Sequence, residues 1–543
     1  MTQKSLVKGA AVLAAAGIIV KVFGAAFRIL LASFITDEGM AYYSPAYYIY
    51  AVLLVVSTSG IPIAISRMVS ERYAIGRFDE ADRVFRISRW LMIGLGAAGF
   101  IVLFFFAGAI ASATRLEGSE LAMQATAPAL LLVPIMSSYR GYFQGQQLMA
   151  PTALSQTVEQ IFRVVFGLLL AVLLMRGTLF AASFTDLQRG AAGGCFGASA
   201  GAVGGLAVMI FIYLLARKEL KQRIRRSTGG ERESAGSILK SIILIAVPIT
   251  IGATLMPLVN LVDATVVNTR LLHAGFEPSV AKALYGQLTG FCEPIVALPQ
   301  VLMSAIVMSI VPMVAAANKV NDTERLHGTI SLGLRMSTII AFPCAIGLII
   351  LAKPALTMLF FTQKESAANA APSLQVLGAS FILLALITIM TGILQGVGKQ
   401  GYPVINLFIG LLFKVVLTWV LVGQPEINVV GAPLGTMAAY LIAAALDLIC
   451  VIRFTSVKLP FHLMITKPFV SAAVMGIFVW GAYKGLVWLT GSNTLSTLAA
   501  IVIGVAVYGV MIIRTKTILR EEMMELSIGR KLVSVGDRLH LWK

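Results

Sequence analysis

The sequence has 543 residues, of which 58% are hydrophobic and 13% charged, and its mean hydropathy is +0.88. Soluble globular domains carry roughly 25% charged residues, so this composition excludes that class and indicates an integral membrane protein. Runs of about 20 apolar residues without strict alternation recur along the chain, and such runs cross a bilayer as helices rather than as barrel strands. The expected fold class is therefore an all-α polytopic membrane protein.

We expect about fourteen transmembrane helices. In chain order their approximate ranges are 9–34, 43–70, 89–112, 124–144, 152–176, 192–215, 239–270, 283–315, 329–352, 371–395, 403–422, 431–453, 466–489 and 495–514. Lys and Arg are densest in segments 71–89 and 217–234 and in the tail from Arg514. The positive-inside rule makes these segments cytoplasmic, so both termini are expected there. The net charge of +18 then reflects topology and attraction to anionic lipid, and no nucleic-acid partner is expected.

Matching motifs indicate an internal repeat. Residues 140–151 read "RGYFQGQQLMAP" and residues 391–403 read "TGILQGVGKQGYP", while "SLVK" at 5–8 corresponds to "SILK" at 237–240. Two six-helix repeats in parallel orientation, related by a pseudo-twofold axis along the membrane normal, are a common transporter plan. The predicted parts are an N-lobe (1–216), a basic cytoplasmic linker (217–238), a C-lobe (239–455), two further helices (456–514) and a cytoplasmic tail (515–543).

The repeated glycine motif closes the fourth and the tenth predicted helix, and two interpretations of it remain open. Glycines four residues apart share one helix face and allow a neighbouring helix to approach closely, which predicts two tight helical hairpins. The glutamines could instead contact lipid head groups or gate the inner mouth. The gating or structural residues of this motif are Gly141, Gln144, Gly145, Gly392, Gln395 and Gly396.

The first lobe carries cations inside apolar spans, where a charge costs several kcal/mol and usually faces a cavity or a partner. Lys21 and Arg28 lie about two turns apart on similar faces of the first helix. Arg67 lies near the inner end of the second helix, where snorkelling explains it equally well, and Glu159 and Arg163 could neutralise each other at i,i+4 spacing. We predict that Lys21, Arg28, Arg67 and Arg163 bind an anionic substrate, in which Arg is a bidentate donor to a phosphate or diphosphate.

The second lobe carries different polar groups. Asn260 and Asp263 lie in the middle of the seventh helix, and Lys414 lies in the eleventh. Burial penalises the charged form of Asp263 unless Lys414 or a bound cation stabilises it. Asp263 is therefore a candidate for proton or sodium coupling, and a purely structural ion pair with Lys414 is the alternative. Snorkelling is the favoured explanation for three charges near span ends, Arg335, Asp447 and Lys484.

Several catalytic and nucleotide-binding motifs are missing. The chain has no HExxH or His-rich metal motif, no Walker A sequence GxxxxGK[ST] and no GxSxG nucleophile elbow. We therefore expect no enzymatic activity, no metal site and no cofactor. The expected energy source is a Na+ or H+ gradient, the membrane potential or the substrate gradient itself.

Six segments, in order along this frame, resemble a known family. They are "KVFGAAFR" (21–28), "GIPIAISRMVSE" (60–71), "GYFQGQ" (141–146), "PLVNLVDATVV" (257–267), "LPQVLMSAIVMSIVP" (298–312) and "NLFIGLLFKVVL" (406–417). Together they resemble the polysaccharide-lipid flippases of the multidrug/oligosaccharidyl-lipid/polysaccharide (MOP) exporter superfamily, in the branch that holds stage V sporulation protein B and the MurJ-type lipid II flippases. The resemblance covers essentially the whole chain.

The resemblance implies a two-lobed transporter with a central cationic cavity, in the plasma membrane of a bacterium. Its substrate would be an undecaprenyl-diphosphate-linked saccharide, most specifically lipid II, moved from the inner to the outer leaflet by alternating access. Lys21 and Arg28 match a basic pair in the first helix of lipid II flippases and would contact the head group. Asp263 matches an acidic position that takes part in sodium binding in some members, and Thr436 in the twelfth helix would be a further oxygen ligand. A monomer is expected.

The chain departs from the family pattern at two places. It reads "GFCEPIVALP" with Glu293 where Gram-negative lipid II flippases carry an Arg, and Asn406 is followed by Lys414 rather than by a carboxylate. The second departure weakens the case for sodium, because Lys414 could take the cation's electrostatic role. The runner-up function is an ion-coupled multidrug or cation antiporter of the same superfamily, which the excess of cations in the first lobe does not suit. A membrane enzyme is disfavoured because the external loops are short and poor in acids, and a scaffold role stays open.

Overall fold

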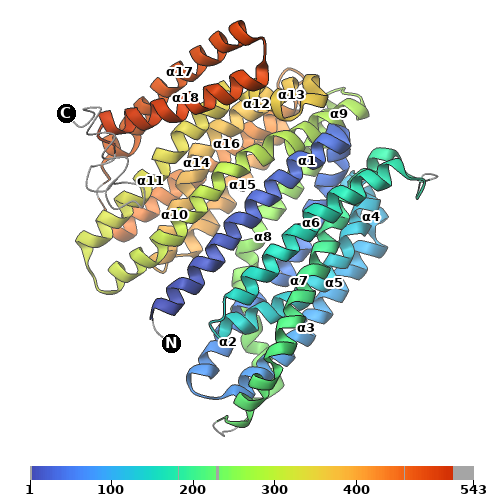
Figure 1. Ribbon diagram of the computed structural model, residues 1–543, viewed down its shortest axis with the longest axis vertical. Helices are drawn as coiled ribbons and strands as arrows, with labels where there is room; N and C mark the ends of the chain where they lie inside the picture. Colours follow the sequence, from blue (N-terminus) through green and yellow to red (C-terminus); the bar gives the residue numbers. More distant parts are fainter. Residues whose placement is uncertain (1–2, 181–182, 228–231, 458, 518–543) are drawn as a thin grey trace. The chain divides into compact units, whose positions relative to one another are not determined.

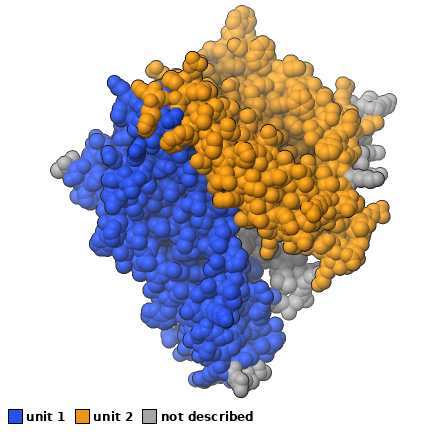
Figure 2. Space-filling model, turned by 180° about the vertical axis from the view of Figure 1, so that it is seen from behind, with its two compact units in different colours: residues 1–272, 276–290 blue, residues 273–275, 291–543 orange. Residues whose placement is uncertain are grey.

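A computed structural model describes residues 3–180, 183–227, 232–457 and 459–517, with side chains from residue 15 onward. The predicted tail therefore lies outside the described residues from position 518. Nearly all the described residues are helical, and none of them forms a strand, as the composition predicts. The chain divides into two compact units, one of residues 1–272 and 276–290 and the other of residues 273–275 and 291–543, coloured separately in Figure 2. The lobe boundaries inferred from the repeat stay a prediction.

Unit 1 contains the first nine α-helices (Figure 1). They are α1 (Gln3–Thr58), α2 (Gly60–Ala74), α3 (Phe78–Phe105), α4 (Ala107–Thr114), α5 (Glu120–Gly145), α6 (Ala150–Arg176), α7 (Asp186–Arg225), α8 (Ala235–His273) and α9 (Pro278–Gly286). A π-helical segment, η1 (Gln287–Cys292), follows. The last residue of unit 1 in this segment is Gly290, so the chain passes from one unit to the other inside η1.

Unit 2 contains the remaining helices. The α-helices are α10 (Glu293–Lys319), α11 (Thr323–Ile350), α12 (Ala352–Leu359), α13 (Lys364–Asn369), α14 (Ala371–Gly396), α15 (Gly401–Val422), α16 (Gly431–Thr455), α17 (Lys467–Thr490) and α18 (Asn493–Arg514). Short 3-10 segments η2 (Phe361–Gln363) and η3 (Asn428–Val430) and the π-helix η4 (His462–Thr466) connect some of them.

The number of membrane crossings agrees with the sequence prediction. Thirteen helical segments in the described part are long and apolar enough to span a bilayer, and the first of them, Ala15–Ala74, has 60 residues. At 1.5 Å per residue that segment would be about 90 Å long, roughly three times the hydrocarbon thickness. It is broken at Thr36, where the backbone has φ 66° and ψ 177°. Two crossings therefore fit into this segment, and the total becomes about fourteen.

Several helices extend beyond the apolar spans that predicted them. The third span was predicted at 89–112, yet α3 begins at Phe78. The sixth was predicted at 192–215, and α7 runs from Asp186 to Arg225. The charged residues that end the apolar runs stabilise these helix ends through the helix dipole. Asp79 and Glu80 lie at the positive N-terminus of α3. Arg223 and Arg225 lie at the negative C-terminus of α7.

Small residues hold the helices of unit 1 together. Gly193, Gly197 and Gly201 form one face of α7 against α6, and a Cβ on Gly197 would lie 2.6 Å from the carbonyl oxygen of Arg163. Such close contact is the usual way in which helices associate where no hydrophobic driving force acts between them. The glycine face of α7 therefore fixes the part of α6 that carries Arg163.

The repeated glycine motifs make equivalent contacts in the two units. Gly141 and Gly145 on α5 pack against α2, where their Cβ atoms would lie 2.7 Å from Pro62 O and 2.8 Å from Ser66 O. Gly392 and Gly396 on α14 pack in the same way against Val307 and Val314 of α10. α2 belongs to the second predicted span and α10 to the eighth. The fourth span therefore packs on the second, and the tenth packs on the eighth. The glycines thus allow close helix approach, although to a different helix from the hairpin partner, and the choice between the hairpin and gating interpretations stays a prediction.

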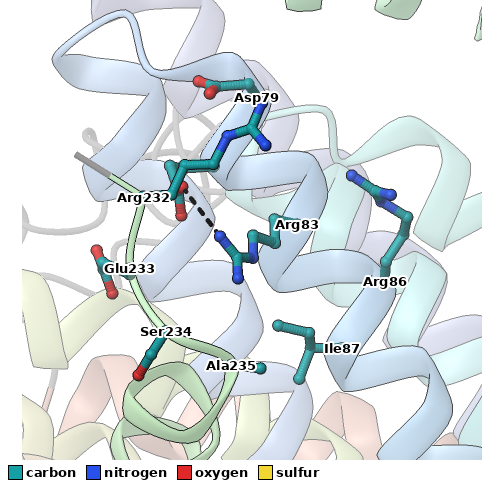
Figure 3. Close-up of a pocket in the computed structure, with 9 residues that line it drawn as sticks. Asp79, Arg83, Arg86, Ile87, Arg232, Glu233, Ser234 and Ala235 are labelled. Atoms are coloured by element: carbon teal, nitrogen blue, oxygen red, sulfur yellow. Dashed lines mark ion pairs between the residues drawn. The ribbon is translucent and has the colours of Figure 1, made fainter. Parts of the chain in front are cut away.

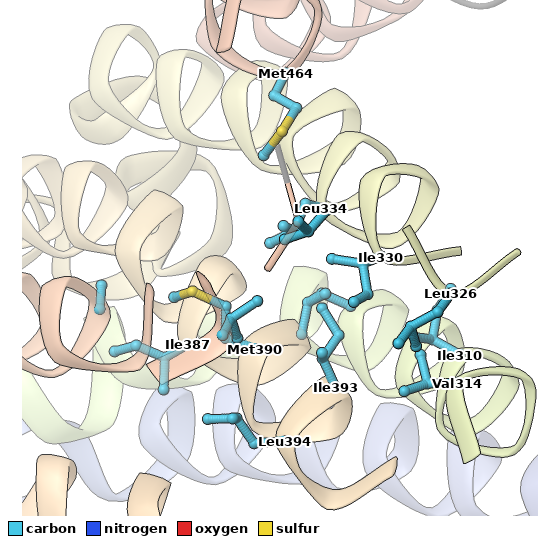
Figure 4. Packing of buried hydrophobic residues seen from close by; sticks show 14 of the residues in the cluster. Ile310, Val314, Leu326, Ile330, Leu334, Ile387, Met390, Ile393, Leu394 and Met464 are labelled. Carbon is cyan, nitrogen blue, oxygen red and sulfur yellow. The ribbon is translucent and has the colours of Figure 1, made fainter. Parts of the chain in front are cut away.

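The apolar core of unit 2 lies between α10, α11, α14 and α16. Fully buried side chains meet there, including Val314, Ile330 and Ile393 (Figure 4). Val451 of α16 belongs to the same cluster. Since these side chains interlock away from lipid, they set the register of the helix bundle into which α15 also packs. Polar groups buried on α15 and α16 are thus held in a rigid surrounding.

Candidate functional site

A ladder of tyrosines runs along the second half of α1. Tyr43 and Tyr47 are stacked, with ring centroids 5.8 Å apart and an interplanar angle of 11°, and Tyr50 follows with its centroid 5.7 Å from that of Tyr47. The spacing of four and three residues places all three rings on one helix face. Tyr43 and Tyr50 are buried, and Tyr47 is part-buried, so Tyr47 is the ring that a charged group can reach.

Two arginines from different helices share the Tyr47 ring. The guanidinium carbon of Arg28, from the first half of α1, lies 5.4 Å from its centroid, and that of Arg163, from α6, lies 5.7 Å away. Arg163 Nη1 also donates to Tyr47 Oη at 3.5 Å. Cation–π contacts of this kind contribute about 0.5–2 kcal/mol each. The ring thus holds two predicted anion-binding residues close together, and a negative group between them would relieve their mutual repulsion.

The carboxylate expected to neutralise Arg163 is engaged elsewhere. Glu159 Oε2 accepts a hydrogen bond from Arg140 Nη2 at 2.8 Å, and the same nitrogen donates to Ser155 Oγ at 2.8 Å. The ion pair that the structure gives Glu159 is therefore with Arg140 on α5 and not with Arg163. The chain brings a second arginine to Glu159 across the α5–α6 hairpin, and the charge of Glu159 still acts on Arg163 from a greater distance.

Buried donors around the ring are unsatisfied. Within the described part of the chain, Gln160 Nε2, Arg163 Nε and Tyr50 Oη have no hydrogen-bond partner. Gln160 is 6% exposed, and its Nε2 lies 3.6 Å from the place that a Cβ on Gly24 would take. A buried donor without an acceptor costs about 1–3 kcal/mol. Donors without acceptors therefore gather between α1 and α6, where the sequence predicts anion-binding residues.

The other two predicted substrate residues lie outside this cluster. Lys21 is exposed and precedes Arg28 by seven residues, which is about 10 Å along the helix axis. Arg67 is an exposed residue of α2 whose Nε pairs with Glu71 Oε1 at 2.9 Å. Lys21 thus continues the same helix face outward, whereas Arg67 makes an ordinary surface ion pair, which usually contributes less than about 1 kcal/mol.

The predicted coupling residues are divided between the units. Asn260 and Asp263 are part-buried on α8 of unit 1, and Lys414 is 4% exposed on α15 of unit 2. The ion pair of Asp263 with Lys414 therefore stays a prediction. Thr436 on α16 donates its hydroxyl to Ala432 O at 3.1 Å, which leaves lone pairs of its oxygen available to a cation. Among the described residues, no group of three or more His, Cys, Asp and Glu side chains could hold a metal ion.

Unit 2 contains a buried polar pair that the sequence analysis missed. Asn406 Nδ2 on α15 donates to Asp447 Oδ1 on α16 at 2.8 Å, and Asp447 is fully buried. The expectation that Asp447 snorkels to the interface is therefore wrong, because its side chain faces α15 instead of the helix end. The carboxylate that appeared to be missing after Asn406 comes from the next helix. Asp447 Oδ2 has no hydrogen-bond partner among the described residues.

The sequence did not single out Tyr47, Arg140 or Gln160, and it placed Asp447 at the membrane interface. One signal was available, since "YYSPAYYIY" at 42–50 repeats tyrosine at the spacing of a helix face. Arg140 and Gln160 gave no signal, because a single polar residue near a span end is equally typical of a surface position. Only the packing of α5, α6 and α1 shows that they face the interior.

Comparisons with known proteins agree with this architecture. The family model described as "Polysaccharide biosynthesis protein" matches residues 6–318, and the MatE model matches residues 289–420. The lipid II flippase MurJ of Bacillus subtilis (strain 168) is 26% identical over 506 residues, which cover 90% of each chain. Stage V sporulation protein B of the same organism is 24% identical over 538 residues, which cover 98% of this chain and all of the relative.

Solved structures show the same fold. The lipid II flippase MurJ in an inward closed conformation aligns with a TM-score of 0.66 at 15% identity, over 92% of this chain and 97% of that one. A multidrug resistance MATE family transporter of the MOP superfamily, in an inward-facing conformation, aligns with a TM-score of 0.62 at 15% identity, over 80% and 94%. The chain therefore belongs to the polysaccharide biosynthesis protein family and is a multi-pass bacterial membrane protein with the fold of MOP-superfamily transporters, not an enzyme.

Proposed function

We propose that this protein moves an undecaprenyl-diphosphate-linked cell-wall saccharide precursor, and specifically lipid II, from the inner to the outer leaflet by alternating access. One observation carries the proposal, namely that Arg28 and Arg163 share the Tyr47 ring beside unsatisfied buried donors. The similarity to a lipid II flippase over 90% of the chain supports the same substrate class. A monomer in the bilayer is sufficient for this mechanism.

The chemistry of the cluster suits a diphosphate. Each guanidinium can donate two parallel hydrogen bonds to one phosphate group, and the two arginines approach the ring from different helices, so one phosphate of the pair can meet each arginine. Tyr47 holds both guanidiniums when the substrate is absent, which limits the side-chain entropy that binding removes. Gln160 supplies a neutral donor on the Lys21 side of Arg28. Lys21 would attract the head group from the more exposed part of the same helix face.

Ion coupling is part of the proposal. Asn260, Asp263 and Thr436 offer oxygen ligands that suit Na+, and Asp263 alone could carry H+. Lys414 would compete with either cation if it pairs with Asp263. The membrane potential is the remaining energy source, since moving one elementary charge across 100 mV corresponds to about 2.3 kcal/mol. Transport is measured while the Na+ gradient, the pH gradient and the membrane potential are each removed in turn with the other two held constant. The gradient whose removal stops transport is the energy source.

The decisive experiment replaces the two arginines on the ring. We expect Arg28→Ala and Arg163→Ala each to lower outward movement of the lipid-linked precursor by about a hundredfold, because each removes a charge-assisted contact to the diphosphate of about 1.5–3 kcal/mol. The measurement is the fraction of precursor exposed on the outer leaflet of cells that depend on this protein. Arg453→Ala, which removes an exposed arginine of α16 that belongs to no predicted site, is the matched control.

Normal precursor exposure in a well-expressed Arg28→Ala variant would rule out the cationic site. Accumulation of a different lipid-linked saccharide on the inner leaflet would keep the flippase mechanism and replace lipid II as its substrate. Depleting the protein in growing cells and in sporulating cells, and measuring precursor accumulation in each, separates a vegetative role from a sporulation role. The similarity to stage V sporulation protein B suggests the second role.

The second candidate is an ion-coupled multidrug or cation antiporter, which the MatE match over residues 289–420 favours. An antiporter for cationic compounds needs acceptors in its site, whereas the cluster in unit 1 presents two guanidiniums. Efflux of a cationic dye that requires this protein and is insensitive to Arg28→Ala would support the antiporter instead.

A further inference from the structure

A cavity of about 580 Å³ lies in unit 1. None of its lining residues belongs to the cluster of Arg28, Tyr47, Gln160 and Arg163. Its wall is formed by the first turns of α3 and by the segment that leads into α8 (Figure 3). Both segments belong to the charge-dense stretches that the sequence predicts to be cytoplasmic. The volume is within the range of sites for small molecules and head groups.

Three arginines face this cavity. Arg83 and Arg86 extend from α3, and Arg232 extends from the opposite wall (Figure 3). The N-terminus of α8, a helix of 39 residues, begins at Ala235 in the lining, and its positive end adds to the potential that an anion would experience. Ser234 Oγ accepts from the backbone N–H of Ser237, so one of the first amides of α8 is already satisfied.

Each acidic residue of the lining contacts another group, although Glu80 Oε2 has no hydrogen-bond partner among the described residues. Glu233 pairs with Arg72 at 2.6 Å, and Glu80, 1% exposed, lies between Arg77 and Arg83 with each nitrogen–oxygen distance 3.7 Å. Asp79 accepts a hydrogen bond from the Ser227 hydroxyl. With Asp82, which pairs with Arg86 at 2.9 Å, four carboxylates face five guanidiniums. The lining itself carries three carboxylates and three guanidiniums, and the positive excess comes from Arg72 and Arg77 behind it. The guanidinium N–H groups and the helix end supply donors for an anion.

The surroundings of the cavity indicate a lipid rather than a soluble ligand. Ile87 and Ala235 form the apolar part of the lining. Trp90 lies one turn further along α3 and is 69% exposed, and Leu244 on α8 is 65% exposed. Exposed Trp is enriched at the boundary between head groups and acyl chains, which would place Arg83 and Arg86 at the level of lipid phosphates.

We propose that this cavity binds the phosphate head group of an anionic phospholipid of the inner leaflet, with the acyl chains along Trp90. Basic pockets between helices on the cytoplasmic side suit such head groups. The bound lipid would join α3 to the linker, in which Ser227 already contacts Asp79 of α3 and Glu233 contacts Arg72 of α2. The proposal is independent of the transported substrate.

The test uses Trp90 as the probe in the full-length protein. The protein is reconstituted in phosphatidylcholine vesicles that contain increasing amounts of phosphatidylglycerol with brominated acyl chains, which quench nearby tryptophan. Subtracting the quenching of a Trp90→Phe variant isolates Trp90 from the other four tryptophans. We expect Trp90 to be quenched at several-fold lower brominated phosphatidylglycerol than brominated phosphatidylcholine.

Two variants and one control make the result specific. Arg232→Gln changes an exposed side chain and leaves the contacts of buried Glu80 intact, so it is expected to fold, and it should lower the preference for phosphatidylglycerol about fivefold. Arg83→Gln should do the same, at some cost in stability. Arg67→Gln, exposed and outside the cavity, should leave the preference unchanged. Equal quenching by the two lipids in the unaltered protein, an unchanged preference in Arg232→Gln, or loss of the preference on adding inorganic phosphate alone would overturn the proposal.

Discussion

The polar cluster on α1 and α6 in unit 1 and the polar pair on α15 and α16 in unit 2 differ in how completely their groups are satisfied. In unit 1, Arg28 and Arg163 share one ring, and both are only part-buried. In unit 2, Asn406 and Asp447 are joined by a hydrogen bond of 2.8 Å and are almost inaccessible. The first cluster has buried donors in excess, while in the second pair a donor meets one carboxylate oxygen and only the acceptor Asp447 Oδ2 is left over.

This difference separates a binding site from a structural contact. Buried polar groups in an apolar helix bundle are costly unless they are satisfied, so a protein retains unsatisfied donors where a ligand completes them. A matched pair instead fixes the register of two helices. We therefore expect substitutions in unit 1 to change ligand affinity with little loss of stability, and substitutions of the unit 2 pair to do the reverse.

The largest expected change in stability is that of Asn406→Ala. Removing the amide leaves the buried Asp447 carboxyl without its donor, which should lower the free energy of unfolding by about 2 kcal/mol. The measurement is unfolding in mixed micelles, combined with Asp447→Ala in a double-mutant cycle that isolates the pair. A stable Asn406→Ala variant that has lost transport would contradict the structural assignment and move this pair into the ion-coupling machinery.

A smaller effect is expected at Tyr47, where two substitutions separate its ring from its hydroxyl. Tyr47→Leu removes both cation–π contacts and should weaken binding of the lipid-linked precursor by about 1 kcal/mol, roughly fivefold. Tyr47→Phe keeps the ring and loses only the 3.5 Å contact to Arg163, so its affinity should change less than twofold. Binding of the purified precursor to protein in micelles measures both. Equal losses in the two variants would show that the hydroxyl, rather than the ring, organises the arginines.

The sequence allowed prediction of the features that depend on local pattern. Apolar runs located the spans, and the repeated glycines identified the faces on which α5 and α14 pack. The partner of each buried charge was not predictable, because it depends on which helices become neighbours. The spacing allowed Glu159 to pair with Arg163, but Glu159 binds Arg140. Asp447 was expected at the interface, but it binds Asn406. In both cases the partner is on the adjacent helix of a hairpin, where periodicity within one helix carries no information.

The smallest expected effect tests the two interpretations of the repeated corner motif. Gln144 Nε2 on α5 donates to the buried Thr152 hydroxyl on α6 at 3.4 Å, whereas Gln395, its counterpart in unit 2, is exposed. A long neutral hydrogen bond contributes about 0.5 kcal/mol, so Gln144→Ala should lower stability by about that amount, Gln395→Ala by less, and neither should alter transport. If Gln144→Ala instead lowers transport severalfold in a protein of unchanged stability, its amide acts on the ligand or the gate. The two corners would then differ in function even though their glycines make the same contacts.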